Sequence, residues 1–378
     1  ANTMATLRIA WHDYNRDEDG FNIYRSDTPM DVNAMPSPIA SVGPNVGAYD
    51  DNTVVGGNEY YYRIGVLRNG EELISEEQIL RALTFVLISA SQDGTLRKID
   101  YEGNEIWKFD DGIIFETVII DTNNSYIYAG GSGGKIVKID LYGNKVTNGW
   151  PFTKYSGTAL ALDIDSDGNL YNGSSDGKVR KIAPNGEEVW VFDGNSGKIG
   201  SIAVDSNGNV YSGSADGTLR KIDPDGNEVT NGWPFTGHSG YYIRGLDVDS
   251  NTGHIYSGSD NAIIRKTNPD GSEVTSGGWP YTGHSSYILN IEVDSNTGNV
   301  YSASADNTAK SIDSNGYIVW TFTGHTGRVY GITADFDGSA YSASYDSTVS
   351  KIDSSGDEVW MFNGHTSRVR DINVYLDY

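Results

Sequence analysis

The stretch KIGSIAVDSNGNVYSGSADGTLRKIDPDGNEVTNGWPFTGH, residues 198–238, decides the fold of this 378-residue chain. It contains four short runs typical of β-strands: KIGSIAVD, NVYSGS, TLRKID and the segment around Trp233. Asp, Asn and Gly residues, which favour tight turns, separate these runs. The stretch therefore predicts one small, four-stranded antiparallel sheet.

The same pattern returns throughout the chain after residue 83. The second and third predicted strands occur in seven copies, and each copy is followed by one tryptophan. These tryptophans lie 40 to 46 residues apart: Trp107, Trp150, Trp190, Trp233, Trp279, Trp320 and Trp360. A strand-rich repeat of about forty residues is typical of β-propellers. We therefore predict an all-β protein with a seven-bladed β-propeller at 84–378, in which the tryptophans pack between neighbouring blades.

The order of the strands predicts how the propeller closes. The first copy begins at Phe85 with the second strand of the pattern and has no first strand before it. Residues 368–375, RVRDINVY, match the first strand RVYGITAD at 328–335 and are followed by no further copy. We expect this C-terminal strand to complete the first blade, so that deletion of the residues after His365 opens the ring.

Residues 1–83 differ from the repeats. They contain no lysine, 6 arginines and 13 acidic residues, and strand-like runs separated by turn-rich stretches. Trp11, DGFNIYRS at 19–26, YDDNTV at 49–54 and NEYYYRIGVL at 58–67 together resemble a fibronectin type III domain. The resemblance implies a small β-sandwich in which Trp11 and Tyr60 to Tyr62 are core and tyrosine-corner residues.

The first strand of that sandwich is short or missing, because only about five residues precede the run TLRIAW at 6–11. An uncovered edge strand readily pairs with another chain. We expect the module at 1–83 to dock onto other proteins or onto a neighbouring subunit, which makes a homo-oligomer one possible outcome.

Gly-His pairs precede several predicted first strands, and an aspartate follows about 22 residues after each of two of them. With the run DGTLRKID, this pattern resembles WD-repeat blades, in which a histidine, a serine and a turn aspartate form a hydrogen-bonded network. The resemblance implies structural pairs between these residues: His284–Asp306, His325–Asp346 and, through ring closure, His365–Asp93. His238 stands at the same position of its repeat, but Asn261 replaces the aspartate with which it would pair.

Other blades depart further from the WD pattern. In two repeats Tyr155 and Asn195 stand at the position of the histidine, and in another Gly133 replaces the aspartate. Ile222 stands where the WD family has its tryptophan. The run NVYSGSADGTLRKIDPDGNEVW also resembles blades of quinoprotein dehydrogenases, which usually have eight blades and a cofactor pocket. We find seven copies and no catalytic motif, so the sequence predicts neither an enzyme nor a bound cofactor.

Composition limits the partners. The net charge of −24 opposes binding to nucleic acid or to an anionic membrane surface. No apolar run approaches the roughly 20 residues that cross a bilayer, and the N-terminal residues do not resemble a signal peptide. The absence of cysteine excludes disulfides and thiolate chemistry.

A basic, tyrosine-edged cluster stands out in this acidic chain. Its residues lie at or near the start of predicted first strands: Lys198, Tyr242, Arg244, Tyr287, Arg328, Arg368 and Arg370. These positions converge near one mouth of a propeller channel. The cluster is a candidate site for an anionic sugar or an acidic peptide, although salt bridges to the abundant aspartates explain it more simply.

The segment DIDSDGN at 163–169 places Asp163, Asp165 and Asp167 around a tight turn, as a calcium loop does. Equivalent turns such as AVDSNGN occur in other copies, so a plain hairpin is the competing interpretation. Calcium is the one metal that the sequence suggests.

Taken together, these features favour a non-catalytic binding or structural protein. Paired propeller and fibronectin-like modules resemble virion-surface proteins, such as phage tail, baseplate or capsid-decoration components, and extracellular proteins. In that setting residues 1–83 contact other virion or surface proteins, and the propeller contacts a host-surface glycan or protein. The alternatives are a secreted carbohydrate-active or quinoprotein-like propeller enzyme and an intracellular WD-repeat scaffold.

Overall fold

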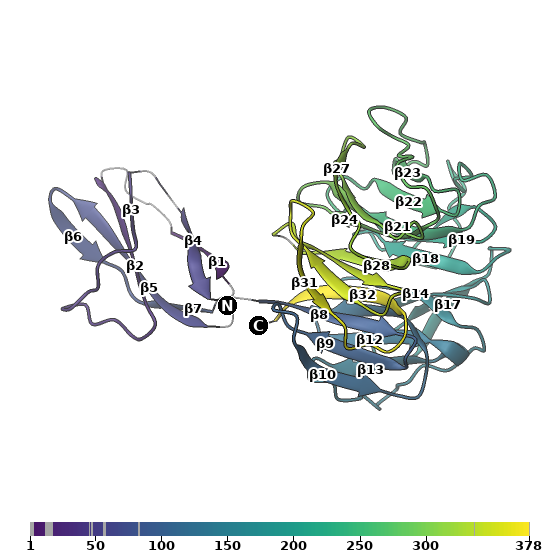
Figure 1. Ribbon diagram of the computed structural model, residues 1–378, viewed down its shortest axis with the longest axis horizontal. Coiled ribbons are helices and arrows are strands. Elements are labelled where there is room, and N and C mark those ends of the chain that lie inside the picture. The colour runs from purple at the N-terminus through teal and green to yellow at the C-terminus, as the bar shows by residue number, and fades with distance from the viewer. Residues whose placement is uncertain are drawn as a thin grey trace. The chain divides into compact units, whose positions relative to one another are not determined.

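The computed structural model describes residues 4–11, 18–44, 46, 48–55, 58–81, 84–335 and 337–377. The chain divides into two compact units, one comprising Ala1–Phe85 with Leu376–Tyr378 and the other Val86–Tyr375. Apart from one 3₁₀ turn, η1 (Ser132–Gly134), the regular elements of the described residues are all β-strands (Figure 1). The all-β prediction is therefore confirmed. The described part of the chain has no helix with the length and apolar character that a membrane span requires.

The first unit has two antiparallel sheets. One pairs β1 (Met4–Ala10) with β4 (Ala48–Val55). The other has the order β3-β2-β5-β6, with β7 also paired to β5. Its strands are β2 (Gly20–Ser26), β3 (Ala40–Val42), β5 (Glu59–Arg68), β6 (Glu71–Ile74) and β7 (Gln78–Arg81).

The core of the first unit lies among Ile23, Val54 and Tyr62, which are almost fully buried. Trp11 is only partly buried and packs on Phe21, with 5.2 Å between ring centroids. In a tyrosine corner the hydroxyl bonds to the backbone. Here the Tyr62 hydroxyl instead donates to the Asp51 carboxylate at 2.8 Å.

The second unit contains seven small antiparallel sheets within the described residues 84–335 and 337–377 (Figure 1). We number them in chain order. They comprise β8 (Thr84–Ser91), β9 (Thr95–Ile99) and β10 (Glu105–Asp110) in sheet 1; β11 (Phe115–Asp121), β12 (Tyr126–Gly131) and β13 (Ile136–Asp140) in sheet 2; β14 (Ala159–Ile164), β15 (Leu170–Ser174), β16 (Val179–Ile182) and β17 (Glu188–Phe192) in sheet 3; β18 (Ile199–Val204), β19 (Val210–Ser214) and β20 (Leu219–Ile222) in sheet 4; β21 (Ile243–Val248), β22 (Ile255–Ser259) and β23 (Ile264–Thr267) in sheet 5; β24 (Ile288–Asp294), β25 (Asn299–Ser304), β26 (Ala309–Ile312) and β27 (Ile318–Phe322) in sheet 6; and β28 (Val329–Ala334), β29 (Ala340–Ser344), β30 (Val349–Ile352) and β31 (Glu358–Phe362) in sheet 7.

Sheet 1 also contains the last strand of the chain, β32 (Val369–Asp377). Its order is β10-β9-β8-β32, so the C-terminal strand lies beside the strand that opens the repeats. Val369 and Ile372 of β32 are buried, and they pack with Leu87 of β8. The C-terminal strand therefore occupies the place that the repeat pattern predicts for it.

Sheets 2, 4 and 5 lack the regular fourth strand that the sequence predicts. Their outer segments touch the third strand through isolated bridges, for example Leu219 with Phe235 in sheet 4. All three segments contain a cis Trp-Pro peptide bond. Proline has no N–H and cannot continue a hydrogen-bonded ladder, so the pairing is interrupted there.

The repeated tryptophans join neighbouring sheets. The indole N–H of Trp107 donates to the carbonyl of Leu141 at 3.1 Å, and that of Trp190 donates to Pro224 at 3.0 Å. Trp150 and Trp279 make the same bond to the next sheet. The Trp190 ring also lies against Gly226, where an added Cβ would come within 2.9 Å of the ring. Each such indole thus contributes both buried apolar surface and one hydrogen bond to the contact between neighbouring sheets.

Candidate functional site

One hydrogen bond recurs at the same end of all seven sheets of the second unit, within the described residues. A backbone N–H from the turn between the second and third strands donates to the carbonyl of the residue just before the first strand. Ala215 donates to Lys198 and Tyr345 donates to Arg328, each at 2.8 Å. We call the accepting residues the entry positions: Ile114, Thr158, Lys198, Tyr242, Tyr287, Arg328 and Arg368.

Five of the seven predicted ligand-binding residues occupy entry positions. The other two, Arg244 and Arg370, lie two residues further along β21 and β32 and line a cavity of about 510 Å³. First strands from all seven sheets contribute to the cavity wall. Of the predicted cluster, Tyr242, Arg244 and Arg370 line this cavity, and the other four residues directly precede first strands that do.

The two arginines that line the cavity are neutralised by ion pairs. The Arg244 guanidinium donates to both carboxylate oxygens of Asp260, at 2.6 and 3.1 Å, and lies 4.1 Å from the centre of the Tyr242 ring. Arg370 donates to Glu116 at 2.6 Å. The simpler interpretation, salt bridges, therefore describes these two arginines.

The other three cations of the cluster remain available. Lys198 and Arg328 are exposed, whereas Arg368 is half-buried with its guanidinium 4.9 Å from the Tyr345 ring centre. Within the described residues, these three side chains form no salt bridge. They are the positive charges at the entry positions that a ligand can still meet.

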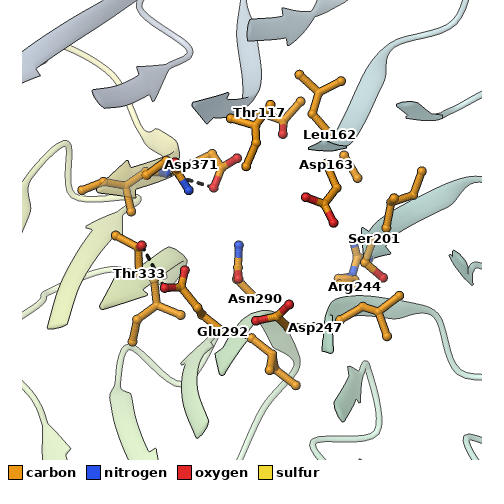
Figure 2. Close-up of a pocket in the computed structure, with 18 of the residues that line it drawn as sticks. Thr117, Leu162, Asp163, Ser201, Arg244, Asp247, Asn290, Glu292, Thr333 and Asp371 are labelled. Carbon is orange, nitrogen blue, oxygen red and sulfur yellow. Dashed lines mark hydrogen bonds between the residues drawn. The ribbon is translucent and has the colours of Figure 1, made fainter. Parts of the chain in front are cut away.

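Four carboxyl groups line the same cavity (Figure 2). They belong to Asp163 on β14, Asp247 on β21, Glu292 on β24 and Asp371 on β32. Each accepts a backbone N–H from the first strand of another sheet: Val204 and Val293 at 2.7 Å, and Ala334 and Val118 at 2.9 Å. The first strand is the inner edge of its sheet, so these carboxylates satisfy N–H groups that have no strand partner.

Burial changes the ionisation of these four groups. Loss of water around the charged form raises the pKa of Asp163 to about 7, of Asp247 and Asp371 to about 6, and of Glu292 to about 8. The backbone hydrogen bonds act in the opposite direction and limit the rise. The inner wall of the cavity is therefore only partly charged at neutral pH.

The histidine networks implied by the WD resemblance are present in sheets 6, 7 and 1. His284 Nδ1 lies 2.8 Å from Asp306, and its Nε2 lies 2.8 Å from the Ser302 hydroxyl. The pairs His325–Asp346 and His365–Asp93 have the same arrangement, at 3.1 and 3.0 Å. Burial opposes ionisation of these aspartates, but hydrogen bonds from the histidine and a nearby threonine lower their pKa. These networks lie within the sheets and tie turns together, which is a structural role.

In two of the other four sheets, sheets 5 and 4, a substitution leaves buried polar groups of the network without a partner in the part of the chain that the structure describes. His238 bonds to Ser257 at 2.8 Å, but its Nδ1 has no partner among the described residues because Asn261 replaces the aspartate. In sheet 4, Asn195 stands at the repeat position of the histidine. There the Ser212 hydroxyl and the Asn195 Nδ2 are both buried without a partner among the described residues. The asparagine side chain is too short to reproduce the histidine bonds.

The structure does not bring together the three carboxylates of the suggested calcium loop. Asp163 points into the cavity and bonds to Val204, whereas Asp165 accepts the backbone N–H of Asp167 at 3.0 Å and the Tyr171 hydroxyl at 2.9 Å. Asp163 belongs to β14 and Asp165 to the turn that follows, and each carboxylate is committed to its own hydrogen bonds. Among the described residues, no group of three or more histidine and acidic side chains has a geometry that could hold a metal.

Sequence reasoning missed most of the inner carboxyl groups. Asp247 and Glu292 align with Asp163 in the runs LDI, LDV and IEV, so their common position in the first strand was visible. Asp371 stands two residues earlier in its strand, and Glu116 carried no signal. Only the arrangement of first strands around one cavity shows that these side chains meet.

Comparison with known proteins agrees with the fold. The family model "WD domain, G-beta repeat" matches residues 186–223, 230–265 and 316–353, which confirms the WD-repeat resemblance for these segments. The crystal structure of the WD40 β-propeller domain of Doa1 is similar, with 19% identity, a TM-score of 0.62, and coverage of 70% of this chain and 88% of that one.

The crystal structure of the computationally designed Ika8 protein is also similar, with 19% identity, a TM-score of 0.58, and coverage of 76% of this chain and 86% of that one. At this identity the likeness shows a β-propeller fold and nothing further. No curated protein sequence matches the chain.

Proposed function

We propose that this chain is a non-catalytic interaction protein, in which a seven-bladed WD-type propeller closed by β32 binds a partner at its entry positions. One observation carries the proposal. The backbone bond at the entry positions is the same in all seven described sheets, whereas the side chains there are Ile, Thr, Lys, Tyr and Arg. A fixed frame that presents varied side chains is how repeat proteins build specific binding surfaces.

The chemistry of this surface favours an anionic partner. Lys198 and Arg328 are exposed and unpaired within the described residues, and Tyr241, Tyr287 and Tyr345 are exposed in the same loops and turns. Tyrosine and arginine are enriched at the centres of protein interfaces. On a chain with a net charge of −24, such a surface attracts and orients an acidic peptide or an anionic glycan.

For the biological setting, we propose a virion surface or another extracellular location. The first unit would dock onto virion or surface proteins as a fibronectin type III-like sandwich; its two-stranded and five-stranded sheets support that comparison. The propeller would then contact a host-surface glycan or protein. Acidity and the lack of cysteine are compatible with this setting.

Two alternatives stay open. An intracellular WD-repeat scaffold would use the same surface, with an acidic peptide as its partner. A secreted carbohydrate-active or quinoprotein-like enzyme would need a catalytic group in the cavity, where Glu292 is the carboxyl with the highest pKa, about 8. We favour binding because the inner carboxylates are engaged with backbone N–H groups of neighbouring sheets.

The deciding experiment measures binding of the labelled full-length chain to bacterial cells, purified surface polysaccharides and acidic peptides. The test variant changes Lys198, Arg328 and Arg368 to alanine. The matched control changes Lys108, an exposed lysine on the outer strand β10, to alanine. We expect saturable binding that the triple variant loses and the control keeps. Equal binding by all three proteins, or a turnover of sugar substrates abolished by Glu292→Gln, would reject the proposal.

A further inference from the structure

The outer edges of the seven sheets share one charged position. This residue lies opposite the last or last but one residue of the third strand, and in six sheets it is Glu or Lys: Glu105, Lys145, Glu188, Glu228, Glu273 and Glu358. Charged residues on an edge strand discourage pairing with other chains. The repeat thus places a charged residue on most of its outer edges, where it opposes pairing with the strands of other chains.

Most of these charges are paired within their own sheet. An arginine on the third strand bonds Glu105, Glu188, Glu228 and Glu273, and Lys145 bonds Asp111. Glu358 accepts a hydrogen bond from Ser350 at 3.2 Å. The charges therefore belong to the architecture of the edge.

Sheet 6 alone breaks this pattern among the seven described sheets. Ile318 occupies the charged position and lies opposite Ile312. Lys310 stands at the third-strand position that arginine occupies in sheets 1, 3, 4 and 5. Because Ile318 replaces the acid, Lys310 donates instead to the Thr321 hydroxyl at 3.0 Å. Of the regular outer strands β10, β17, β27 and β31, only β27 contains no charged residue.

The side chains of this edge are apolar and exposed. Tyr317, Ile318 and Val319 are 58%, 48% and 52% exposed, and Thr321 is also exposed. Trp320 and Phe322 point the other way and pack in the core with Tyr301. An uncharged edge strand of β-branched and aromatic residues is a template for strand addition.

We propose that β27 is a self-association site, at which two copies of this chain pair their β27 strands antiparallel and join two sheets into one. This inference is independent of the entry positions and goes beyond the function proposed above.

Charge argues for a second copy as the occupant. Two chains that each carry −24 repel one another, so they can approach closely only where both surfaces lack acidic residues. When β27 strands of two copies pair antiparallel about Val319, Tyr317 of one copy lies opposite Thr321 of the other. No like charges come together, which favours cross-strand pairing. The same pairing of β17 or β31 would bring two copies of Glu188 or Glu358 close together.

The test is sedimentation equilibrium of the full-length chain over a range of concentrations. We expect a dimer, and we expect Ile318→Glu to weaken it at least tenfold. This variant restores the residue type of the other sheets and gives Lys310 an acidic partner, so it should fold. Val189→Glu, at the position of β17 that corresponds to Val319, adds the same charge elsewhere and should leave the dimer intact.

A second measurement does not depend on the stability of a charged variant. The chain has no cysteine, so Val319→Cys can form a disulfide only between two copies. Directly opposed residues of antiparallel strands are close enough for such a bond, and oxidation should give a covalent dimer. A wild-type chain that stays monomeric, an Ile318→Glu dimer as tight as wild type, or equal weakening by Val189→Glu would overturn the proposal.

Discussion

The indole N–H of Trp360 donates to the backbone carbonyl of Tyr101 at 2.8 Å, across 259 residues of sequence. The bond links sheet 7 to sheet 1 in the way that Trp107 links sheet 1 to sheet 2. The Trp360 ring also lies against Gly103, where an added Cβ would come within 2.9 Å of it. The last repeat therefore contacts the first through the same device that joins consecutive repeats.

Deletion of residues 366–378 should destabilise the protein severely. It removes β32, including the buried side chains of Val369, Ile372 and Tyr375, and exposes the edge of β8. Burial of one large apolar side chain contributes about 1.5–3 kcal/mol, so we expect a loss of at least roughly 5 kcal/mol, measured by urea unfolding. Trp360→Phe, which removes one hydrogen bond and part of the ring from the same contact, should cost at least about 1 kcal/mol. A truncated chain as stable as the full one would contradict closure by β32.

Asn195→His should stabilise the protein. The new imidazole would reach Ser212 and Asp216, which correspond to the partners of His284 in sheet 6. Satisfying two buried polar groups should add about 1 kcal/mol to the free energy of unfolding. Asn195→Ala serves as the control, because it cannot make these bonds, and should be no more stable than wild type. If the histidine variant unfolds at the same urea concentration as the alanine variant, the equivalence of the two sites is wrong.

Asn261→Asp should change the ionisation of His238. Burial and the positive charge of Arg265 lower the pKa of this histidine to about 3, and its Nδ1 has no partner among the described residues. A carboxylate at position 261 would accept a bond from Nδ1 and favour the charged form. We expect the His238 pKa, followed by NMR titration, to rise by at least one unit. The pKa of the half-buried His254 should stay constant as an internal reference.

The four carboxyl groups that line the cavity should lower the free energy of unfolding as the pH rises from about 5 to 8. The pKa values of Asp163, Asp247, Glu292 and Asp371 lie between about 6 and 8 in the folded protein, above the usual 4 of an unfolded chain. These four groups therefore bind more protons in the folded state than in the unfolded state in this range, and through them a higher pH favours unfolding. This contribution is fully present below about pH 4 and is lost by about pH 8.

Glu292→Gln isolates one of these groups. Glutamine keeps an oxygen that can accept from Ala334 but cannot ionise. At pH 8 the variant should melt a few degrees above wild type, roughly 2–4 °C for each kcal/mol, and at pH 5 the two should melt alike. A difference that does not depend on pH would show that the Glu292 proton is not involved.

Calcium should not change the melting temperature. Asp165 is committed to backbone N–H groups and to Tyr171, and Asp163 points into the cavity instead of the turn. A metal would have to replace these hydrogen bonds. A rise in melting temperature with added calcium, abolished by Asp167→Asn, would show that the loop rearranges to bind the ion.

The sequence predicted the repeats, their all-β character and the partner of the last strand, because each of these follows from local periodicity. The pairs His284–Asp306, His325–Asp346 and His365–Asp93 could be foreseen from the resemblance of these three repeats to WD-repeat blades. The missing fourth strands of sheets 2, 4 and 5 were not foreseen, although the Trp-Pro dipeptides that interrupt them were visible.

The candidate site divides in the same way. The sequence by itself determined which residues stand at the entry positions, because these are fixed by their place in the repeat. Only the tertiary structure decided which cations are free: Arg244 and Arg370 find acidic partners in other strands, whereas Lys198 and Arg328 do not within the described residues. Likewise, the inner carboxylates meet N–H groups about 41 to 253 residues away. Hydrophobic periodicity and turn-forming residues act over a few residues, so the sequence shows them directly. Ion pairs and burial depend on distances between side chains that are set only when the sheets pack together.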